Sequence, residues 1–294
     1  MAVCPLAKVT TFRPSCCVPR SSSRTPTPAD PQERTRAMPR GGKMRDALKD
    51  GRKQLGGWVN MESLIATEIM AGAGFDILMI DQEHGPGDFL SAIGQQQAIR
   101  AGGPCGACLR VYANDINVIK KTLDSGIDGL MVPMVETAEA AADVVAACLM
   151  PPLGLRGVAP GNVRAARYGY EKDHFIATKG QDVFIMTQVE TATTVENLKA
   201  INKLGGIDIL FIGRNDLASS IGRLDDQDSS EPRELLAEAE RKIKESGRWL
   251  GGISAHGDSA AVMFERGYDM VIAAADHTLL HDGAGSLVRS LADR

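Results

Sequence analysis

Four times along the chain, a Gly-x-Asp triplet leads into a short run of apolar residues. The triplets begin at Gly74, Gly126, Gly206 and Gly267, and runs such as ILMI and ILFI follow them. Glycine accepts the left-handed conformation that ends a helix, and an unbroken apolar run is typical of a strand buried on both faces. The repeat therefore predicts alternating helices and parallel strands. When such strands close into a barrel, active sites form at their C-terminal ends.

The rest of the chain after residue 42 follows the same alternation. We expect eight strands, at residues 55–59, 77–81, 107–111, 129–134, 183–190, 209–213, 250–254 and 270–274. Helical patterns occupy residues 44–53, 63–73, 116–125, 138–149, 193–204, 232–246, 259–266 and 278–292. The predicted fold class is α/β, a (β/α)8 TIM barrel spanning residues 43–294. Residues 151–180 interrupt the alternation, and we expect them to form a loop packed over the barrel mouth.

Composition excludes several classes of function. The net charge of −4 gives no basic surface for a polyanion, so no nucleic-acid partner is expected. The apolar runs are too short to cross a bilayer, so no membrane association is expected. Cys105 and Cys108 have the spacing of a redox pair but lie inside an apolar run, which favours buried structural cysteines.

Residues 1–42 differ from everything after them. They are rich in arginine, serine, threonine and proline, and the first acidic residue is Asp30. This composition cannot build a core and predicts a disordered N-terminal extension. It is also the composition of an organellar transit peptide. Two localisations therefore stay open: cytoplasmic, or organellar (plastid or mitochondrion) if the segment is a targeting signal.

The second apolar run ends in four consecutive polar residues, Asp81, Gln82, Glu83 and His84. Polar groups directly after a buried strand cost solvation free energy unless they face a cavity or partners. A histidine in such a place can accept a proton near neutral pH. The alternative is a loop histidine that makes an ordinary backbone hydrogen bond.

Carboxylates follow the fifth and sixth strands. Gln188 and Glu190 are two residues apart and so share one face near the end of their strand. Asp216 follows the next strand, and two carboxylates aimed into one mouth repel each other unless a cation or proton lies between them. A divalent metal is the simplest answer, with Mg²⁺ favoured and Mn²⁺ or Co²⁺ as alternatives. Otherwise Glu190 and Asp216 serve as helix N-terminal carboxylates.

Two further charged residues are candidates. Arg110 ends the third strand, where its guanidinium can hold a carboxylate or an enolate oxygen; the alternative is a salt bridge to Asp115 or Glu136. Asp124 ends a helical segment and so opposes the helix dipole, which suggests a specific partner, either a histidine or a lysine. The remaining histidines, at 174, 256, 277 and 281, are interpreted as structural or peripheral. No phosphate-binding glycine motif is present, so ATP and NAD are not implied.

Together these segments resemble the HpcH/HpaI aldolase family of metal-dependent pyruvate aldolases. The resemblance covers residues 44–292 and rests on five motifs in order: AGAGFDILMIDQEHGP, LRVYANDINVIKKTLDSGIDGLMVPMVET, PPLGLRGV, TQVET and FIGRNDLASS. The family commonly has proline where this chain has Arg214. That departure places a cation next to the expected metal ligand.

The resemblance implies site roles. His84 is the catalytic base, Arg110 stabilises the enolate, and Asp124 supports the base. Glu190 and Asp216 bind the metal, while Gln188, Asn215 and Asp216 contact the pyruvate moiety. Asp81 lies beside the base and is expected to orient it. Resemblance to a fungal relative that uses the same metal-enolate chemistry on oxaloacetate implies that Tyr168 or Tyr170 contacts a substrate unusual for the family.

The implied activity is reversible cleavage of a 2-keto-4-hydroxy acid to pyruvate and an aldehyde. The partners are then a small 2-oxoacid and an aldehyde, and the last helix is expected to exchange between subunits of a homo-oligomer, a hexamer or trimer of dimers. An acyl-CoA lyase or an oxaloacetate-decarboxylating enzyme of the same superfamily stays open. So does a barrel that binds a metal or oxoacid without catalysis.

Overall fold

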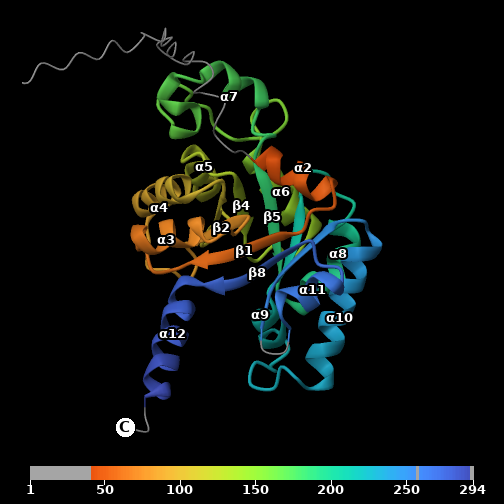
Figure 1. Ribbon diagram of the computed structural model, residues 1–294. Helices are drawn as coiled ribbons and strands as arrows, with labels where there is room; N and C mark the ends of the chain where they lie inside the picture. Colours follow the sequence, from red (N-terminus) through yellow and green to blue (C-terminus); the bar gives the residue numbers. More distant parts are fainter. Residues whose placement is uncertain (1–40, 256–257, 292–294) are drawn as a thin grey trace, which may run out of the picture. The chain divides into compact units, whose positions relative to one another are not determined.

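Eight parallel strands close into one barrel in the order β1 to β8, which confirms the predicted TIM-barrel class (Figure 1). The computed structural model describes residues 41–255 and 258–291. The predicted extension at residues 1–42 therefore lies outside the described residues, apart from its last two. The barrel closes where β8 pairs with β1.

The strands lie close to their predicted positions, and the described helices include four that the pattern did not indicate. The strands are β1 (Gln54–Val59), β2 (Ile77–Asp81), β3 (Gly106–Arg110), β4 (Gly129–Val132), β5 (Phe184–Val189), β6 (Ile209–Ile212), β7 (Trp249–Ile253) and β8 (Met270–Ala275). The helices are α2 (Gly41–Lys49), α3 (Leu64–Gly72), α4 (Phe89–Gly102), α5 (Ile116–Asp124), α6 (Ala138–Cys148), η1 (Arg164–Gly169), α7 (Lys172–Thr178), α8 (Ala192–Ile201), α9 (Arg214–Ser219), α10 (Ser230–Glu245), α11 (Ala260–Glu265) and α12 (Asp276–Ser290). The four that the pattern did not indicate are α4, η1, α7 and α9.

Each Gly-x-Asp triplet makes the same turn and the same backbone contact at the N-terminal end of the barrel. All four glycines have positive φ, between 79° at Gly126 and 104° at Gly74. Each aspartate then accepts a hydrogen bond from the backbone N–H at the start of the preceding strand. These bonds are Asp76 with Leu55 (2.8 Å), Asp128 with Ala107 (2.8 Å), Asp208 with Ile185 (2.8 Å) and Asp269 with Leu250 (2.9 Å). We call these four contacts the aspartate clasps.

The apolar strands are buried on both faces, which explains their unbroken apolar runs. In β2, Ile77 and Met79 point into the barrel, while Leu78 and Ile80 join the layer beneath the helices. At the N-terminal end, Met44 and Leu48 of α2 pack among the inward residues and close the barrel floor. The fold thus leaves its polar strand ends at the opposite, C-terminal rim.

The described cysteines are structural, as predicted. Cys105, Cys108 and Cys148 are free and buried. Burial raises the pKa of the thiols of Cys105 and Cys148 to about 12. Such thiols are not ionised near neutral pH and are poor nucleophiles. In the described part of the chain, no helix is long and apolar enough to span a membrane.

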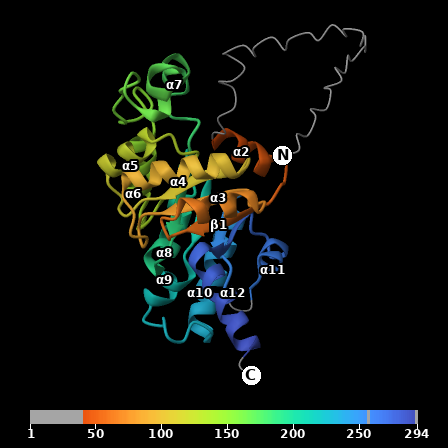
Figure 2. The ribbon, with the colours of Figure 1, turned by 60° about the vertical axis from the view of Figure 1, so that its left-hand side comes forward.

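The prediction that residues 151–180 cover the barrel mouth is wrong. The segment connects the end of α6 to the start of β5, so it lies at the N-terminal end of the strands. Figures 1 and 2 show α7 at the end of the barrel where α2 lies. The exposed Tyr168 and Tyr170 belong to this segment and cannot reach the C-terminal rim of their own barrel.

Two helices depart from the simple amphipathic pattern. Helix α4 was not predicted because its buried face carries Gln95 and Gln96, so the apolar period is interrupted. Helix α12 follows β8 and points away from the barrel in Figures 1 and 2. Its apolar residues Leu280, Leu287 and Val288 are each more than 60% exposed. Its exchange between subunits stays a prediction.

Candidate active site

The C-terminal ends of β2, β3, β5 and β6 bring most of the predicted site residues together. Asp81 and Arg110 end β2 and β3 and face each other in the register of the two strands. Gln188 lies near the end of β5, and Glu190 follows that strand. All four side chains are buried. Asp216 approaches from α9, which begins directly after β6.

Arg110 is the centre of this cluster. Its Nε and Nη2 donate to the two carboxylate oxygens of Asp81 at 2.9 and 2.7 Å. Its Nη1 lies 3.0 Å from Oε2 of Glu83 and 3.5 Å from Oε1 of Gln188. The guanidinium also stacks 4.3 Å from the ring centre of Trp58. The expected alternative partners, Asp115 and Glu136, make other contacts, so Arg110 belongs to the site.

Asp81 positions Arg110 and the backbone that carries His84. Burial alone would raise the pKa of Asp81, but the hydrogen bonds and charge of Arg110 outweigh it and hold the pKa below its ordinary value. Asp81 also accepts hydrogen bonds from Asn60 Nδ2 and from the backbone N–H groups of Glu83 and His84. Its hydrogen bond to His84 is with the backbone N–H. That Asp81 orients the His84 side chain stays a prediction.

Glu190 is held by neighbours on both sides. One carboxylate oxygen accepts a hydrogen bond from the backbone N–H of Met134, and the other accepts one from Nε2 of Gln188. Met134 has a positive φ of 54°, an uncommon conformation for a side chain other than glycine. The strained Met134 peptide thus fixes the orientation of Glu190.

Glu190 and Asp216 converge over Gly213. A Cβ atom on Gly213 would lie 3.3 Å from Oδ2 of Asp216 and 3.4 Å from Cβ of Glu190. Burial raises the pKa of Glu190; the Met134 N–H opposes this, while the negative charges of Glu83 and Asp216 add to it. A similar rise holds for Glu83, where burial again dominates. The cluster therefore holds more negative charge than Arg110 alone compensates.

These residues fit a divalent cation. Carboxylate oxygens are the ligands that Mg²⁺ prefers, and an excess of negative charge attracts a cation. Among residues 41–255 and 258–291, no group of three or more His, Cys, Asp or Glu side chains forms a ready cage for a metal. Two carboxylates would leave positions for water and substrate, as in catalytic metal sites that keep few protein ligands.

His84 lies at the edge of this cluster. Its side chain is 67% exposed, and its Nε2 is 4.0 Å from Oε2 of Glu83. An exposed imidazole can exchange protons with solvent and with a substrate that enters the mouth. Glu83, which was not among the predicted site residues, joins His84 to Arg110. Its signal was its place in the four-residue polar run.

Asp124 lies elsewhere. It ends α5, and helices run antiparallel to the strands they follow, so its carboxylate lies at the N-terminal end of the barrel. There Oδ1 accepts a hydrogen bond from Nη2 of the buried Arg156 at 3.0 Å. No hydrogen bond or ion pair between described residues joins Asp124 to His84. Within one chain, Asp124 cannot support the base.

Arg214 follows β6 in sequence but does not face the carboxylates. Its Nη2 lies 3.0 Å from Asp228, and its Nη1 lies 3.7 Å from Asp258. The expectation that Arg214 places a cation next to the metal ligand is therefore wrong, because its side chain pairs with residues outside the site. Asn215 is exposed next to it, and its contact with substrate stays a prediction. The segment containing His256 lies outside the described residues.

Asp276 ties β8 to β1 at the same rim. It is the first residue of α12, directly after the N-cap residue Ala275. The buried carboxylate of Asp276 accepts hydrogen bonds from the backbone N–H groups of Asn60 and Met61 at 3.0 to 3.2 Å. Asn60 in turn donates to Asp81. Asp276 therefore stabilises the loop that supports the site.

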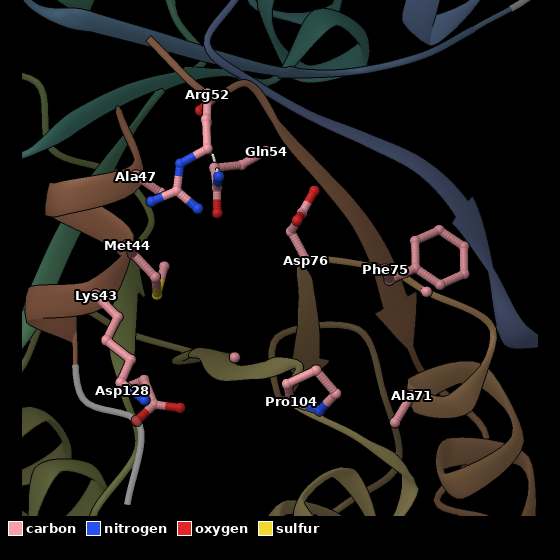
Figure 3. Close-up of a pocket in the computed structure, with 12 residues that line it drawn as sticks. Lys43, Met44, Ala47, Arg52, Gln54, Ala71, Phe75, Asp76, Pro104 and Asp128 are labelled. Atoms are coloured by element: carbon pink, nitrogen blue, oxygen red, sulfur yellow. Dashed lines mark hydrogen bonds between the residues drawn. The ribbon is translucent and has the colours of Figure 1, made fainter. Parts of the chain in front are cut away.

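A separate cavity of about 290 Å³ lies at the barrel floor (Figure 3). It is lined by Lys43 and Met44 of α2 and by Asp76 and Asp128 of the aspartate clasps. This is the opposite end from the strand ends that carry His84. The cavity is therefore not the candidate active site.

Comparison with known proteins agrees with this geometry. The family model described as HpcH/HpaI aldolase/citrate lyase matches residues 54–282. The chain is 38% identical to 4-hydroxy-2-oxovalerate aldolase of Rhodococcus jostii, over 84% of this chain and 94% of that protein. It is 37% identical to 4-hydroxy-2-oxo-heptane-1,7-dioate aldolase of Klebsiella pneumoniae, over 83% and 91%. A solved HpcH/HpaI aldolase/citrate lyase family protein from Burkholderia cenocepacia matches with a TM-score of 0.80 and 32% identity, over 85% and 98%.

Proposed function

This chain belongs to the HpcH/HpaI aldolase/citrate lyase family, and we propose that it cleaves a 2-keto-4-hydroxy acid reversibly to pyruvate and an aldehyde. It is a carbon–carbon lyase of the pyruvate aldolase type. The observation that carries the proposal is the meeting of Glu190 and Asp216 beside Arg110 at neighbouring strand ends. That arrangement suits a 2-oxoacid, whose carboxylate and keto oxygens need positive charge on one side.

The proposed cofactor is a divalent metal held by Glu190 and Asp216, with Mg²⁺ first and Mn²⁺ or Co²⁺ as substitutes. A bound divalent cation supplies Lewis-acid polarisation of the keto and carboxylate oxygens. The Met134 N–H and Gln188 fix the Glu190 carboxylate toward that position. Gln188 also lies beside Arg110 and so can contact the pyruvate moiety.

The chain's own residues supply the proton transfer and the charge stabilisation. In the cleavage direction, His84 accepts the proton of the 4-hydroxyl group. The electrons of that O–H bond form the aldehyde carbonyl as the C3–C4 bond breaks. The C3–C4 electron pair passes to the pyruvate enolate, whose oxygen faces Nη1 of Arg110. Protonation of C3 then gives pyruvate, and the reverse sequence forms the new bond.

Arg110 is prepared for this role before the substrate arrives. Its Nε and Nη2 are bound by Asp81, and Trp58 covers one face of the guanidinium. Nη1 faces Glu83 and Gln188 instead of Asp81, and this is the edge that would meet the enolate oxygen. A guanidinium held in this way needs little reorganisation when charge develops.

A homo-oligomer, a hexamer or trimer of dimers, is part of the proposal. The exposed Leu280, Leu287 and Val288 on α12 support an apolar surface that a second subunit covers by helix exchange. In such an assembly, residues at the barrel floor of one chain, Asp124 included, are available to another.

The test is pyruvate release from 4-hydroxy-2-oxovalerate and from 4-hydroxy-2-oxoheptanedioate, after chelation by EDTA and after adding back Mg²⁺ or Mn²⁺. We expect turnover to disappear with EDTA and return with metal. Full activity after thorough chelation would sink the metal-dependent mechanism. Cleavage of an acyl-CoA substrate instead, or decarboxylation of oxaloacetate alone, would assign the chain to another reaction of the superfamily. Oxoacid binding without turnover would assign a binding role.

A further inference from the structure

Arg214 anchors a chain of ion pairs that runs from α9 into the core. Its Nη2 lies 3.0 Å from Asp228, in the loop before α10, and its Nη1 lies 3.7 Å from Asp258, before α11. Asp258 in turn binds Arg266 through two hydrogen bonds of 3.0 and 3.1 Å. This series of ion pairs thus joins three segments on the outer side of the barrel rim.

The inner end of this chain is buried. Nε of Arg266 lies 3.1 Å from Glu240, and the hydroxyl of Tyr268 donates to the same carboxylate at 2.8 Å. Glu240 is 7% exposed and Tyr268 is 1% exposed. Burial, with the charge of Glu240 adding to it, raises the pKa of the Tyr268 hydroxyl, so the phenol stays a donor. The packed core therefore fixes the end of this ion-pair series that lies farthest from Arg214.

Ion pairs to Asp228 and Asp258 hold the guanidinium of Arg214. A cavity of about 360 Å³ lies beside it, lined by Arg214, Arg233, Arg266, Asp228, Asp258 and Glu240, with Leu236 and Ala237. The side chain of Arg214 is only 17% exposed, although its partner Asp228 is 77% exposed. Asp228 supplies the hydrogen bond to Arg214 at 3.0 Å, and the less exposed Asp258 adds a longer ion pair at 3.7 Å, which Arg266 connects to the core.

We propose that Arg214 is a positioning residue that sets the place of Asp216. Both residues lie in the first turn of α9, a helix of only six residues. In the described part of the chain, no hydrogen bond or ion pair holds the Asp216 side chain. Its position therefore follows the orientation of α9, which Arg214 ties to Asp228 and Asp258. This inference rests on the proposed metal-binding role of Asp216.

The direction in which metal affinity changes distinguishes a positioning role of Arg214 from a simple charge effect. If Arg214 acted only through its positive charge, its removal would strengthen binding of a cation, and removal of the negative charge of Asp258 would weaken it. Positioning predicts that both changes weaken metal binding, because each one releases α9. The two explanations therefore differ in the result for Arg214→Met.

The experiment is calorimetric titration of the full chain with Mn²⁺, without substrate. We expect Arg214→Met and Asp258→Asn each to weaken Mn²⁺ binding about tenfold, the loss typical of groups that orient a metal ligand. Arg214→Lys should retain part of the affinity. The matched control is Arg223→Met. It breaks the exposed ion pair between Arg223, in the loop after α9, and Glu231 of α10, and it should leave Mn²⁺ affinity unchanged.

Three outcomes are distinguishable. Mn²⁺ binding by Arg214→Met that equals or exceeds that of the unmodified protein overturns the positioning role. No Mn²⁺ binding by the unmodified protein overturns the proposed function instead. If Arg214→Met does not fold, Asp228→Asn gives the test, because Asp228 is exposed and is one of the two anchors; it should weaken Mn²⁺ binding to a smaller degree, and unchanged binding contradicts the proposal.

Discussion

Asp81 and Arg110 end two neighbouring strands and are paired residues in the register of β2 and β3, where they form a two-pronged ion pair. The pair is buried, so each partner depends on the other for compensation of its charge.

Asp81→Asn tests this dependence. The substitution leaves Arg110 buried beside a neutral group and should destabilise the fold by about 3 kcal/mol, typical of a broken buried pair. Turnover should fall further than stability explains, because Arg110 loses its orientation. Urea unfolding and steady-state rates at a temperature where the variant is folded measure the two effects. Unchanged turnover would mean that Arg110 is positioned by Trp58 and Glu83 alone.

His84→Ala tests the base. Removal of a general base typically costs about 10²–10⁴ in rate. Because the His84 side chain is exposed and, among the described residues, forms no hydrogen bond or ion pair with Glu190 or Asp216, Mn²⁺ affinity and the melting temperature should stay unchanged. Calorimetry measures the Mn²⁺ affinity and the melting temperature, and a pyruvate-release assay on the same preparation measures turnover. A variant with near-normal turnover reassigns the base.

Trp58→Leu tests the stacking on Arg110. A buried cation–π contact is worth about 2 kcal/mol, so loss of the ring should lower kcat about tenfold or more if the contact serves the transition state. The value of KM should change less than kcat, because the enolate charge develops only during the reaction. A rise in KM alone would instead indicate a role in substrate binding.

Glu190→Gln tests the raised pKa of Glu190. A carboxyl whose pKa is raised on folding stabilises the fold below its unfolded pKa, and that contribution is lost as pH rises through the folded pKa. In EDTA, the variant should therefore unfold at higher urea concentration than the unmodified protein at pH 8. The difference should shrink as the pH falls toward about 4.3, the ordinary pKa of glutamate.

The same variant should lose the stabilisation that added Mn²⁺ gives to the unmodified protein, because ligand binding stabilises only a fold that can bind it. Equal stabilisation of both proteins by Mn²⁺ would place the metal elsewhere.

Asp208→Asn tests an aspartate clasp. Asp208 accepts hydrogen bonds from the backbone N–H of Ile185 and from Arg45. The variant should lose about 1–3 kcal/mol of stability, the cost of a weakened buried hydrogen bond. Mn²⁺ affinity should not change, since the clasp lies at the opposite end from Glu190. Altered metal affinity at full folding would show that the two ends are coupled.

The fold could be predicted largely because its signals are local. The triplet at Gly74 and the apolar run after it lie within ten residues of each other, and the other triplets repeat this local pattern. Helix α4 was missed because its buried face carries Gln95 and Gln96; Gln96 bonds to Ser125 and Arg164, which are distant in sequence. A polar buried face has no apolar period to detect.

The site was predicted in outline, since polar residues after buried strands must converge in a barrel. Directions of side chains were harder to predict. Arg110 ends β3 and Arg214 comes two residues after β6, yet Arg214 turns outward because Asp228 and Asp258 bind it. The floor position of residues 151–180 could have been deduced from the order of helix and strand. Composition alone suggested the mouth.

The aspartate clasps occur on alternate seams of the barrel: β1 with β2, β3 with β4, β5 with β6, and β7 with β8. The barrel is therefore built from four equivalent two-strand blocks. A circular permutation that opens the chain between β2 and β3 keeps every block continuous, whereas one that opens it between β1 and β2 leaves a clasp to join the two new ends of the chain.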